Sequence, residues 1–469
     1  MMVKYTLEQM KMPSATRTRW RIPLAGFLLA LMGGFSYAWG VLVVPLMERF
    51  GWTKTETTLP FTAFMVVFAL VMVPAGRLQD RLGPKIVSSV GAVLFLVAYG
   101  LAAMVGYFPH AWWLVVTYGL IGGTACGLTY ACVAPPTRKW FPDKPGLAVS
   151  TAVMGFGLAA LAVAPIKSEY LLHVHGIEGT FLIIGGLTLV VSLWASRMME
   201  NPPEGWTPPN WIPARMPTST TLVELDLTPR EVVGTRLFWM IWVTLGSVIS
   251  GGFVAIGLIP AYGLSIGLTS TDAALAISIF AAFNGFGRPV AGFLADHYGT
   301  FRVMLATYVI QAVTLLAFPV FAVTLPGLYL ASALLGWGFA VTLGLFPVIT
   351  SNCYGVKHLG ANYGLVFTAF GVGALTQALG SWIFDVTGSY TPAFIAAGIL
   401  AGLGLTFCAL MNARHTGRNG QAKLAATVRS CQQSQVQDTV DNDDGYPHAP
   451  QNHADNTIRR ASSAGRHPR

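Results

Sequence analysis

Long apolar runs alternate with short polar segments along most of the chain. Many of these runs reach about 20 residues, the length that crosses a bilayer core as a helix. A membrane β-barrel would instead show alternating segments of about ten residues. The pattern predicts twelve membrane-spanning helices, at residues 22–47, 58–77, 85–107, 112–135, 146–167, 178–197, 237–262, 272–294, 301–323, 326–350, 361–384 and 391–412.

A polar segment divides these spans into two sets of six. It covers residues 198–236 and contains the stretch NPPEGWTPPNWIPARMP. Its prolines disfavour helix and hold the chain extended. We therefore predict an N-terminal six-helix bundle at 22–197 and a C-terminal one at 237–412, joined by a linker.

Charge sets the expected orientation in the membrane. Only 10% of the residues are charged, whereas a soluble protein has about a quarter. Lysine and arginine gather in alternate loops, which predicts a cytoplasmic linker and cytoplasmic termini in a multi-pass protein of the cell membrane, inner or plasma. Residues 1–21 then form a cytoplasmic N-terminal segment, and the polar residues 413–469 a disordered cytoplasmic tail. The net charge of +9 follows from this topology and does not indicate nucleic-acid binding.

Two short stretches repeat between the halves. GRLQDRLGPK begins at Gly76 and GFLADHYGTFR begins at Gly292, and both fit Gly-x-Leu-x-Asp-x-x-Gly. Such a repeat indicates two related bundles. The first glycine permits close helix packing and the second a tight turn. The aspartate is placed to cap a neighbouring helix N-terminus or to pair with a loop arginine. We predict that the repeats form gating loops through Gly76, Asp80, Arg81, Gly83, Gly292, Asp296 and Gly299.

With this repeated loop, the chain resembles the major facilitator superfamily over residues 20–412. The stretches GFSYAWGVLVVPL, KWFPDKPGLA, NPPEGW and DVTGSYTPAF look like the oxalate/formate antiporter family, which is close to the monocarboxylate transporters. The resemblance implies an all-α membrane protein with the major facilitator fold, twelve transmembrane helices in two six-helix bundles. It also implies a carrier of small organic anions that works by alternating access around a central site.

Arg288 lies inside a predicted span, where an arginine costs about 3 kcal/mol on insertion scales. Asn284 precedes it by one helical turn and projects from the same face. The spans hold few acids, and Glu169, Asp272 and Asp385 all lie near span ends, so none is clearly at mid-depth. We therefore expect Arg288 to bind an anionic substrate, since a guanidinium suits a carboxylate through two parallel hydrogen bonds. A backbone-bonded structural arginine and a misplaced span boundary are the alternatives. The resemblance implies a substrate-binding arginine at this position.

One fixed positive charge balances one carboxylate. In the oxalate exchangers that the chain resembles, a lysine on the eleventh span supplies a second cation, and Phe370 occupies that position here. We therefore favour monocarboxylates such as lactate, pyruvate, glycolate or formate, with oxalate/formate exchange as the alternative. Tyr37 and Tyr130, which match family positions, and Trp337 are further candidates to line the cavity, although packed core is the other interpretation.

Other function classes find little support. The five cysteines show no metal-like spacing, and we find no nucleotide-binding loop, HExxH motif or nucleophile–base set. We expect neither an enzyme nor an ATP-driven pump, no cofactor or metal, and a monomer. A membrane sensor is the remaining alternative, but its tail has no folded output domain. We expect proton coupling, with the proton-carrying residue left open because Asn284 is neutral.

Overall fold

The computed structural model describes residues 19–203, 206–208 and 226–416. Within these ranges the chain forms helices and turns without any strand, so the predicted all-helical class is confirmed. The predictions for most of the N-terminal segment, much of the linker and nearly all of the tail lie outside the described residues.

The first bundle contains long helices and several shorter, tighter or wider segments. Its elements are α3 (Arg21–Gly34), η1 (Phe35–Trp39), α4 (Gly40–Phe50), α5 (Lys54–Leu82), α6 (Pro84–Ala102), η2 (Ala103–Gly106), α7 (Ala111–Leu114), η3 (Val115–Gly122), α8 (Gly123–Tyr130), α9 (Ala134–Trp140), α10 (Pro145–Ile166), η4 (Lys167–Leu171) and α11 (Leu172–Met198).

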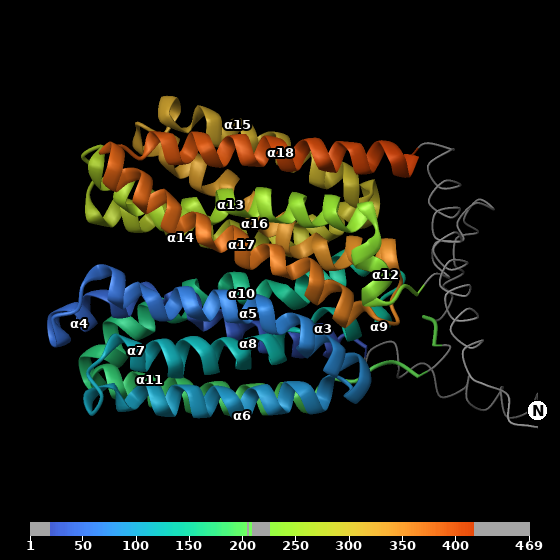
Figure 1. Ribbon diagram of the computed structural model, residues 1–469, viewed down its shortest axis with the longest axis horizontal. Helices are drawn as coiled ribbons and strands as arrows, with labels where there is room; N and C mark the ends of the chain where they lie inside the picture. The colour runs from blue at the N-terminus through green and yellow to red at the C-terminus, as the bar shows by residue number, and fades with distance from the viewer. Residues whose placement is uncertain (1–18, 204–205, 209–225, 417–469) are drawn as a thin grey trace, which may run out of the picture. The chain divides into compact units, whose positions relative to one another are not determined.

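The second bundle is built from longer, less interrupted helices. A short helix, α12 (Pro229–Gly234), lies within the predicted linker, and the bundle follows as α13 (Arg236–Ser265), α14 (Ser270–Tyr298), α15 (Thr300–Phe321), α16 (Leu325–Tyr354), α17 (Leu359–Thr387) and α18 (Thr391–Thr416). In Figure 1 the blue-to-teal helices group together, and so do the yellow-to-red ones.

Threonine begins several of the long helices. The hydroxyls of Thr53, Thr235, Thr269 and Thr324 each accept a hydrogen bond from a backbone N–H of the first turn. These bonds satisfy amide groups that have no partner inside the helix. Thr228 and Glu231 form a capping box around the start of α12, which explains a helix in a proline-rich segment where we predicted none.

Eleven stretches of the described residues are long and apolar enough to cross a membrane. One of them, Pro145–Met198, is 54 residues long, or about 80 Å as one helix, against a bilayer core of about 30 Å. Gly176 breaks it in a left-handed conformation, with φ 65° and ψ −170°. Two predicted spans, 146–167 and 178–197, lie on the two sides of this break, which accounts for the difference between eleven and twelve.

The first predicted span is not one continuous α-helix. It changes to a tighter helix at η1, where Ala38 has non-helical angles of φ −85° and ψ 19°. Glycines precede and follow this segment, and glycine is among the weakest helix formers. The break places Tyr37 between α3 and α4, and the Ala38 carbonyl accepts a hydrogen bond from the Lys167 side chain at 3.2 Å.

Two helix pairs join the bundles. α5 packs against α17, and α10 packs against α14. In the second pair Gly157 faces Gly285 so closely that a Cβ on Gly157 would lie 2.9 Å from the Gly285 Cα. This approach brings the backbone of α10 within reach of side chains on α14, including Arg288.

Candidate functional site

Arg288 is fully buried on α14, at 0% exposure. Its Nη1 donates to the backbone carbonyl of Val153 on α10 at 2.6 Å, and its Nη2 donates to Asn284 Oδ1 at 3.1 Å. The first bond crosses between the bundles. The second follows from the four-residue spacing that puts both side chains on one helix face.

The guanidinium of Arg288 has a hydrogen-bond donor that is not used among the described residues. Arg288 Nε is buried and has no hydrogen-bond partner among the described residues. The ion pairs of these residues do not include Arg288 either. A buried charge without an opposite charge is costly, so this group is suited to bind an anion that the protein itself does not supply.

Three tyrosines surround this charge. The side chains of Tyr37, Tyr130 and Tyr363 all interact electrostatically with Arg288. Tyr37 comes from the break in the first span, Tyr130 from the end of α8, and Tyr363 from α17. The Tyr37 hydroxyl is buried without a hydrogen-bond partner among the described residues. The cluster therefore combines one cation with hydroxyl groups from both bundles.

An aromatic wall adjoins the tyrosines. Phe156 packs edge-on against both Tyr37, at a centroid distance of 4.9 Å, and Tyr130, at 5.4 Å. Phe68 contacts Tyr130 at 5.4 Å and Phe370 at 5.9 Å. Phe370 is buried and also stacks on Phe367 at 4.6 Å. Phe370 therefore contributes an apolar surface at the position where the resemblance would put a lysine.

Trp337 lies against the backbone beside Arg288. Its indole N–H donates to the Thr307 hydroxyl on α15 at 3.1 Å, so its polar end is already bonded. Its ring lies against Gly287, where an added Cβ would come within 3.2 Å of it. Trp337 supports the backbone next to Arg288, and its polar group is bonded to α15.

The two repeated stretches each contact the opposite bundle. Asp80 on α5 accepts hydrogen bonds from the amides of Gly360 at 3.2 Å and Ala361 at 2.9 Å, in the first turn of α17. A Cβ on Gly76 would overlap the carbonyl of Gly360. We call this set the α5–α17 clasp. The sequence allowed either a helix N-terminus or a loop arginine as the partner of this aspartate, and in the structure the partner is the N-terminus of α17.

The second repeat makes the matching contact. Asp296 on α14 accepts hydrogen bonds from Gly146 at 2.7 Å and Leu147 at 2.8 Å, in the first turn of α10. A Cβ on Gly292 would overlap the carbonyl of Gly146. We call this set the α10–α14 clasp. Arg138 strengthens the same side, since its Nε donates to the Ser351 hydroxyl at 2.9 Å.

The repeats are helix ends rather than loops, which corrects the prediction of two gating loops. α5 continues to Leu82 and α14 to Tyr298, so Gly83 and Gly299 alone form the turns, at φ 84° and 90°. The predicted spans ended where the apolar runs give way to polar residues. The helices continue past that point, because Asp80 and Asp296 are bonded to the opposite bundle. Arg81 is exposed in the last turn of α5.

Sequence reasoning missed several parts of this site. It did not find Tyr363, the aromatic partners Phe68 and Phe156, or the two glycines that receive the clasps. Gly146 begins a predicted span and Gly360 directly precedes one, and this similar position was the available signal. It also missed Lys167, which is buried at 4% exposure where a predicted span ends.

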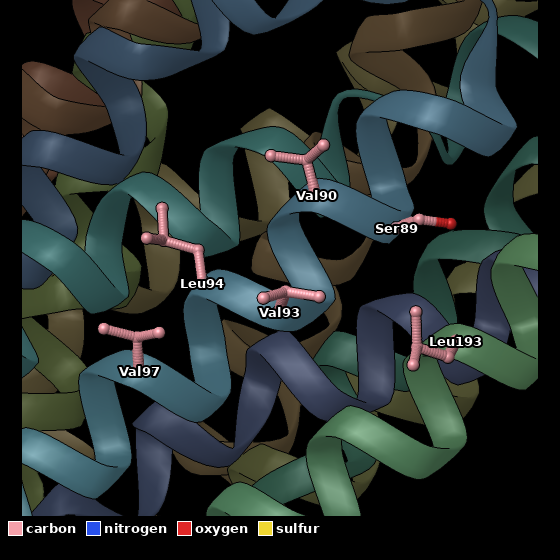
Figure 2. Close-up of a pocket in the computed structure, with 6 residues that line it drawn as sticks. All are labelled: Ser89, Val90, Val93, Leu94, Val97 and Leu193. Atoms are coloured by element: carbon pink, nitrogen blue, oxygen red, sulfur yellow. The ribbon is translucent and has the colours of Figure 1, made fainter.

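A groove between α6 and α11 is lined mainly by apolar side chains. Figure 2 shows side chains of α6 and of Leu193 on α11, with valines and leucines predominating and Ser89 at one end. Val90 and Val93 are half-exposed there. In a membrane protein such a surface faces lipid, and it has no charged group to bind a small anion.

The chain matches known transporters over most of its length. The Major Facilitator Superfamily model matches residues 24–269 and 241–436. The oxalate:formate antiporter of Oxalobacter formigenes is 28% identical over 360 residues, which cover 75% of this chain and 81% of the relative. Monocarboxylate transporter 9 of Mus musculus is 24% identical over 466 residues, with coverage of 82% and 91%.

Solved structures agree on the fold. The crystal structure of the major facilitator transporter FucP in the outward conformation matches with a TM-score of 0.62 and 15% identity, covering 83% of this chain and 99% of FucP. At this identity the match shows the fold alone. The predicted fold of two six-helix bundles and the resemblance to oxalate/formate and monocarboxylate carriers are confirmed. The protein is thus an integral membrane transporter, and the chain belongs to the major facilitator superfamily.

Proposed function

We propose that this protein is a secondary carrier of small monocarboxylates such as lactate, pyruvate, glycolate or formate, and not an enzyme. The observation that carries the proposal is the buried Arg288 guanidinium, which has no acidic partner and an Nε without any partner among the described residues. A carboxylate matches the planar geometry of this group and offsets the cost of burying it.

The surroundings of Arg288 support a singly charged substrate. The side chains that accompany it are the neutral Asn284 and three tyrosines, and the adjoining wall is made of phenylalanines. Hydroxyl groups can hydrogen-bond a carboxylate or a hydroxyl on its neighbouring carbon. The phenyl groups suit a small apolar substituent and offer nothing to a second carboxylate.

The clasps support alternating access. Each closes one helix pair between the bundles at the same end of the molecule, through two hydrogen bonds from helix amides to a carboxylate. We assign this end to the cytoplasmic side, following the distribution of lysine and arginine. The structure then corresponds to a carrier closed towards the cytoplasm, and release of both clasps lets the bundles rock to the opposite state. FucP, a fold relative, was likewise solved in an outward conformation.

Oxalate/formate exchange is the second candidate, because a relative named oxalate:formate antiporter is 28% identical. Oxalate carries two charges and would favour a second cation beside Arg288. Phe370 fills the position that the resemblance assigns to that cation, among Phe367, Phe68 and Phe253. This difference favours the monocarboxylate over the dicarboxylate.

Uptake by proteoliposomes tests the proposal. Labelled lactate and labelled oxalate are offered to the purified protein, with and without an inward proton gradient, and Arg288→Ala serves as the site variant. We expect lactate uptake that the gradient accelerates and that Arg288→Ala abolishes. Preferential oxalate uptake that exchanges with internal formate and ignores pH would support the second candidate instead.

A further inference from the structure

Lys167 is a buried basic residue that the central site does not use. It begins η4, directly after α10, and only 4% of it is exposed. Its Nζ donates to the backbone carbonyl of Ala38 at 3.2 Å, and the ion pairs of the described residues do not include it. Arg49, in contrast, is paired with Glu178 of α11 at 2.6 Å. An ammonium group has three donors, and a neutral carbonyl satisfies one of them here.

Position along α10 relates Lys167 to the rest of the site. The helix begins at the α10–α14 clasp, next offers the Val153 carbonyl to Arg288, and ends just before Lys167. Lys167 follows Val153 by 14 positions, which corresponds to about 20 Å along a helix. Arg288 therefore lies between the clasp and Lys167.

The order of clasp, Arg288 and Lys167 along α10 places Lys167 at the end of the bundles opposite the clasps. The clasps hold the bundles together at one end, Lys167 lies towards the opposite end of α10, and we place the entry route of the anion at that opposite end. The carbonyl that Lys167 contacts belongs to the break in the first span, and the preceding residue, Tyr37, interacts with Arg288. The two basic side chains are thus connected through adjacent residues, 37 and 38, of one broken helix.

Lys167 and Arg288 belong to different levels of the bundle. Lys167 stands about 20 Å of helix rise beyond Val153, whose carbonyl Arg288 contacts. Lys167 is therefore suited to hold one carboxylate at a separate position.

We propose that Lys167 forms an outer carboxylate-binding site, where the anion binds before it moves on to Arg288. The proposal rests on the proposed function, since it assumes an anionic substrate. The ligand is a small carboxylate held by the ammonium group next to the Ala38 carbonyl. An attractive charge on the entry route raises the rate at which a dilute anion reaches the inner site.

Kinetics of lactate entry from the Lys167 side test this site. Lys167→Gln and the apolar Lys167→Met remove the charge, Lys167→Arg keeps it, and Lys144→Gln removes an exposed charge at the other end of α10. We expect both neutral variants to raise KM about 10- to 100-fold, as loss of one charged hydrogen bond predicts, with kcat retained. Lys167→Arg and Lys144→Gln should keep the wild-type KM.

Three results overturn the proposal. They are an unchanged KM in both neutral variants, a fall in kcat at constant KM, and failure of Lys167→Arg to restore KM. The last two would mark Lys167 as a structural support of the broken helix. The Arg288→Ala variant distinguishes a failure of the proposed function from a failure of the outer site. If it transports like wild type, the proposed function fails; if it is inactive while the Lys167 variants behave like wild type, the outer site alone fails.

Discussion

The guanidinium of Arg288 on α14 donates to the backbone carbonyl of Val153 on α10 at 2.6 Å. This bond joins a side chain of one bundle to the main chain of the other. A carboxylate bound at the unpartnered Nε would share this guanidinium with the Val153 carbonyl. Substrate binding and the contact between the bundles are therefore linked at one residue.

Arg288→Lys tests the need for a planar, two-pronged donor. Lysine keeps the charge but presents a point charge in place of the fork. Loss of one charge-assisted hydrogen bond costs about 1.5–3 kcal/mol, so we expect lactate kcat/KM to fall about 10- to 100-fold. Initial uptake rates, normalised to the protein present in the membrane, measure the effect.

Arg302→Lys is the matched control for this substitution. Arg302 is exposed near the start of α15, so the same chemical change should leave uptake unaffected. Wild-type kcat/KM in Arg288→Lys would contradict the role of the guanidinium geometry.

Phe370→Lys tests the origin of the preference for one charge. It places a cation among Phe68, Phe253 and Phe367, near the tyrosines. A second carboxylate then gains a partner, and we expect the ratio of oxalate to lactate kcat/KM to rise at least about tenfold, equivalent to roughly 1.4 kcal/mol. Competition uptake with both labelled anions measures the ratio. Phe370→Met, which stays neutral, should not change it, and an unchanged ratio in Phe370→Lys would refute the assignment.

Asp80→Asn and Asp296→Asn test the clasps. Each removes a charge from a helix cap and should weaken it by about 1 kcal/mol. The open-clasp population should then increase about fivefold for each variant. A cysteine in place of the buried Ser150, whose hydroxyl donates to Gly344 across the bundles, reports this opening.

The rate of maleimide labelling at that cysteine is measured in a background whose native cysteines are replaced. Asp385→Asn removes an exposed carboxylate near the far end of α17 and should leave the rate unchanged. Equal labelling in all variants would show that the aspartates do not hold the two bundles together.

Gly292→Ala tests the close approach at the α10–α14 clasp. The added methyl group would overlap the Gly146 carbonyl, so the two helices cannot meet as they do here. We expect a carrier that stays open at the clasp side and transports at less than about a tenth of the wild-type rate, since a clash of backbone against Cβ costs at least 1–3 kcal/mol. Uptake and Ser150→Cys labelling together measure this outcome.

Gly402→Ala is the matched control, because a Cβ there meets no atom within 4 Å. It makes the same substitution in α18, another helix of the same bundle. Normal transport by Gly292→Ala would show that the clasp closes with more room than its geometry suggests.

Local features of the site followed from the sequence. The spacing of Asn284 and Arg288 predicted one helix face, and the side chains hydrogen-bond at 3.1 Å. The motif glycines Gly83 and Gly299 were expected in tight turns, and both have positive φ. Each feature depends on residues close together in the chain, where helical geometry and glycine chemistry decide the outcome.

Long-range features did not follow. Val153 meets Arg288 across 135 positions, and it contributes a backbone carbonyl that every residue possesses. Lys167 stands at the end of the predicted span 146–167, and a lysine at the end of an apolar run usually extends to the membrane surface. The carbonyl of Ala38, at the break in the first span, is the buried partner of the Lys167 ammonium group. In the sequence this break has no distinct signature beyond the glycines around it.

Saturation binding of radiolabelled lactate to the purified protein tests the central assignment most directly. Wild type, Arg288→Ala and the control Arg302→Lys are compared at equal amounts of folded, monodisperse protein. We predict saturable binding to wild type and Arg302→Lys, displaced by pyruvate more readily than by oxalate, and no saturable binding of similar affinity to Arg288→Ala. Lactate binding of equal affinity to Arg288→Ala would contradict the assignment of Arg288 as the partner of the substrate carboxylate.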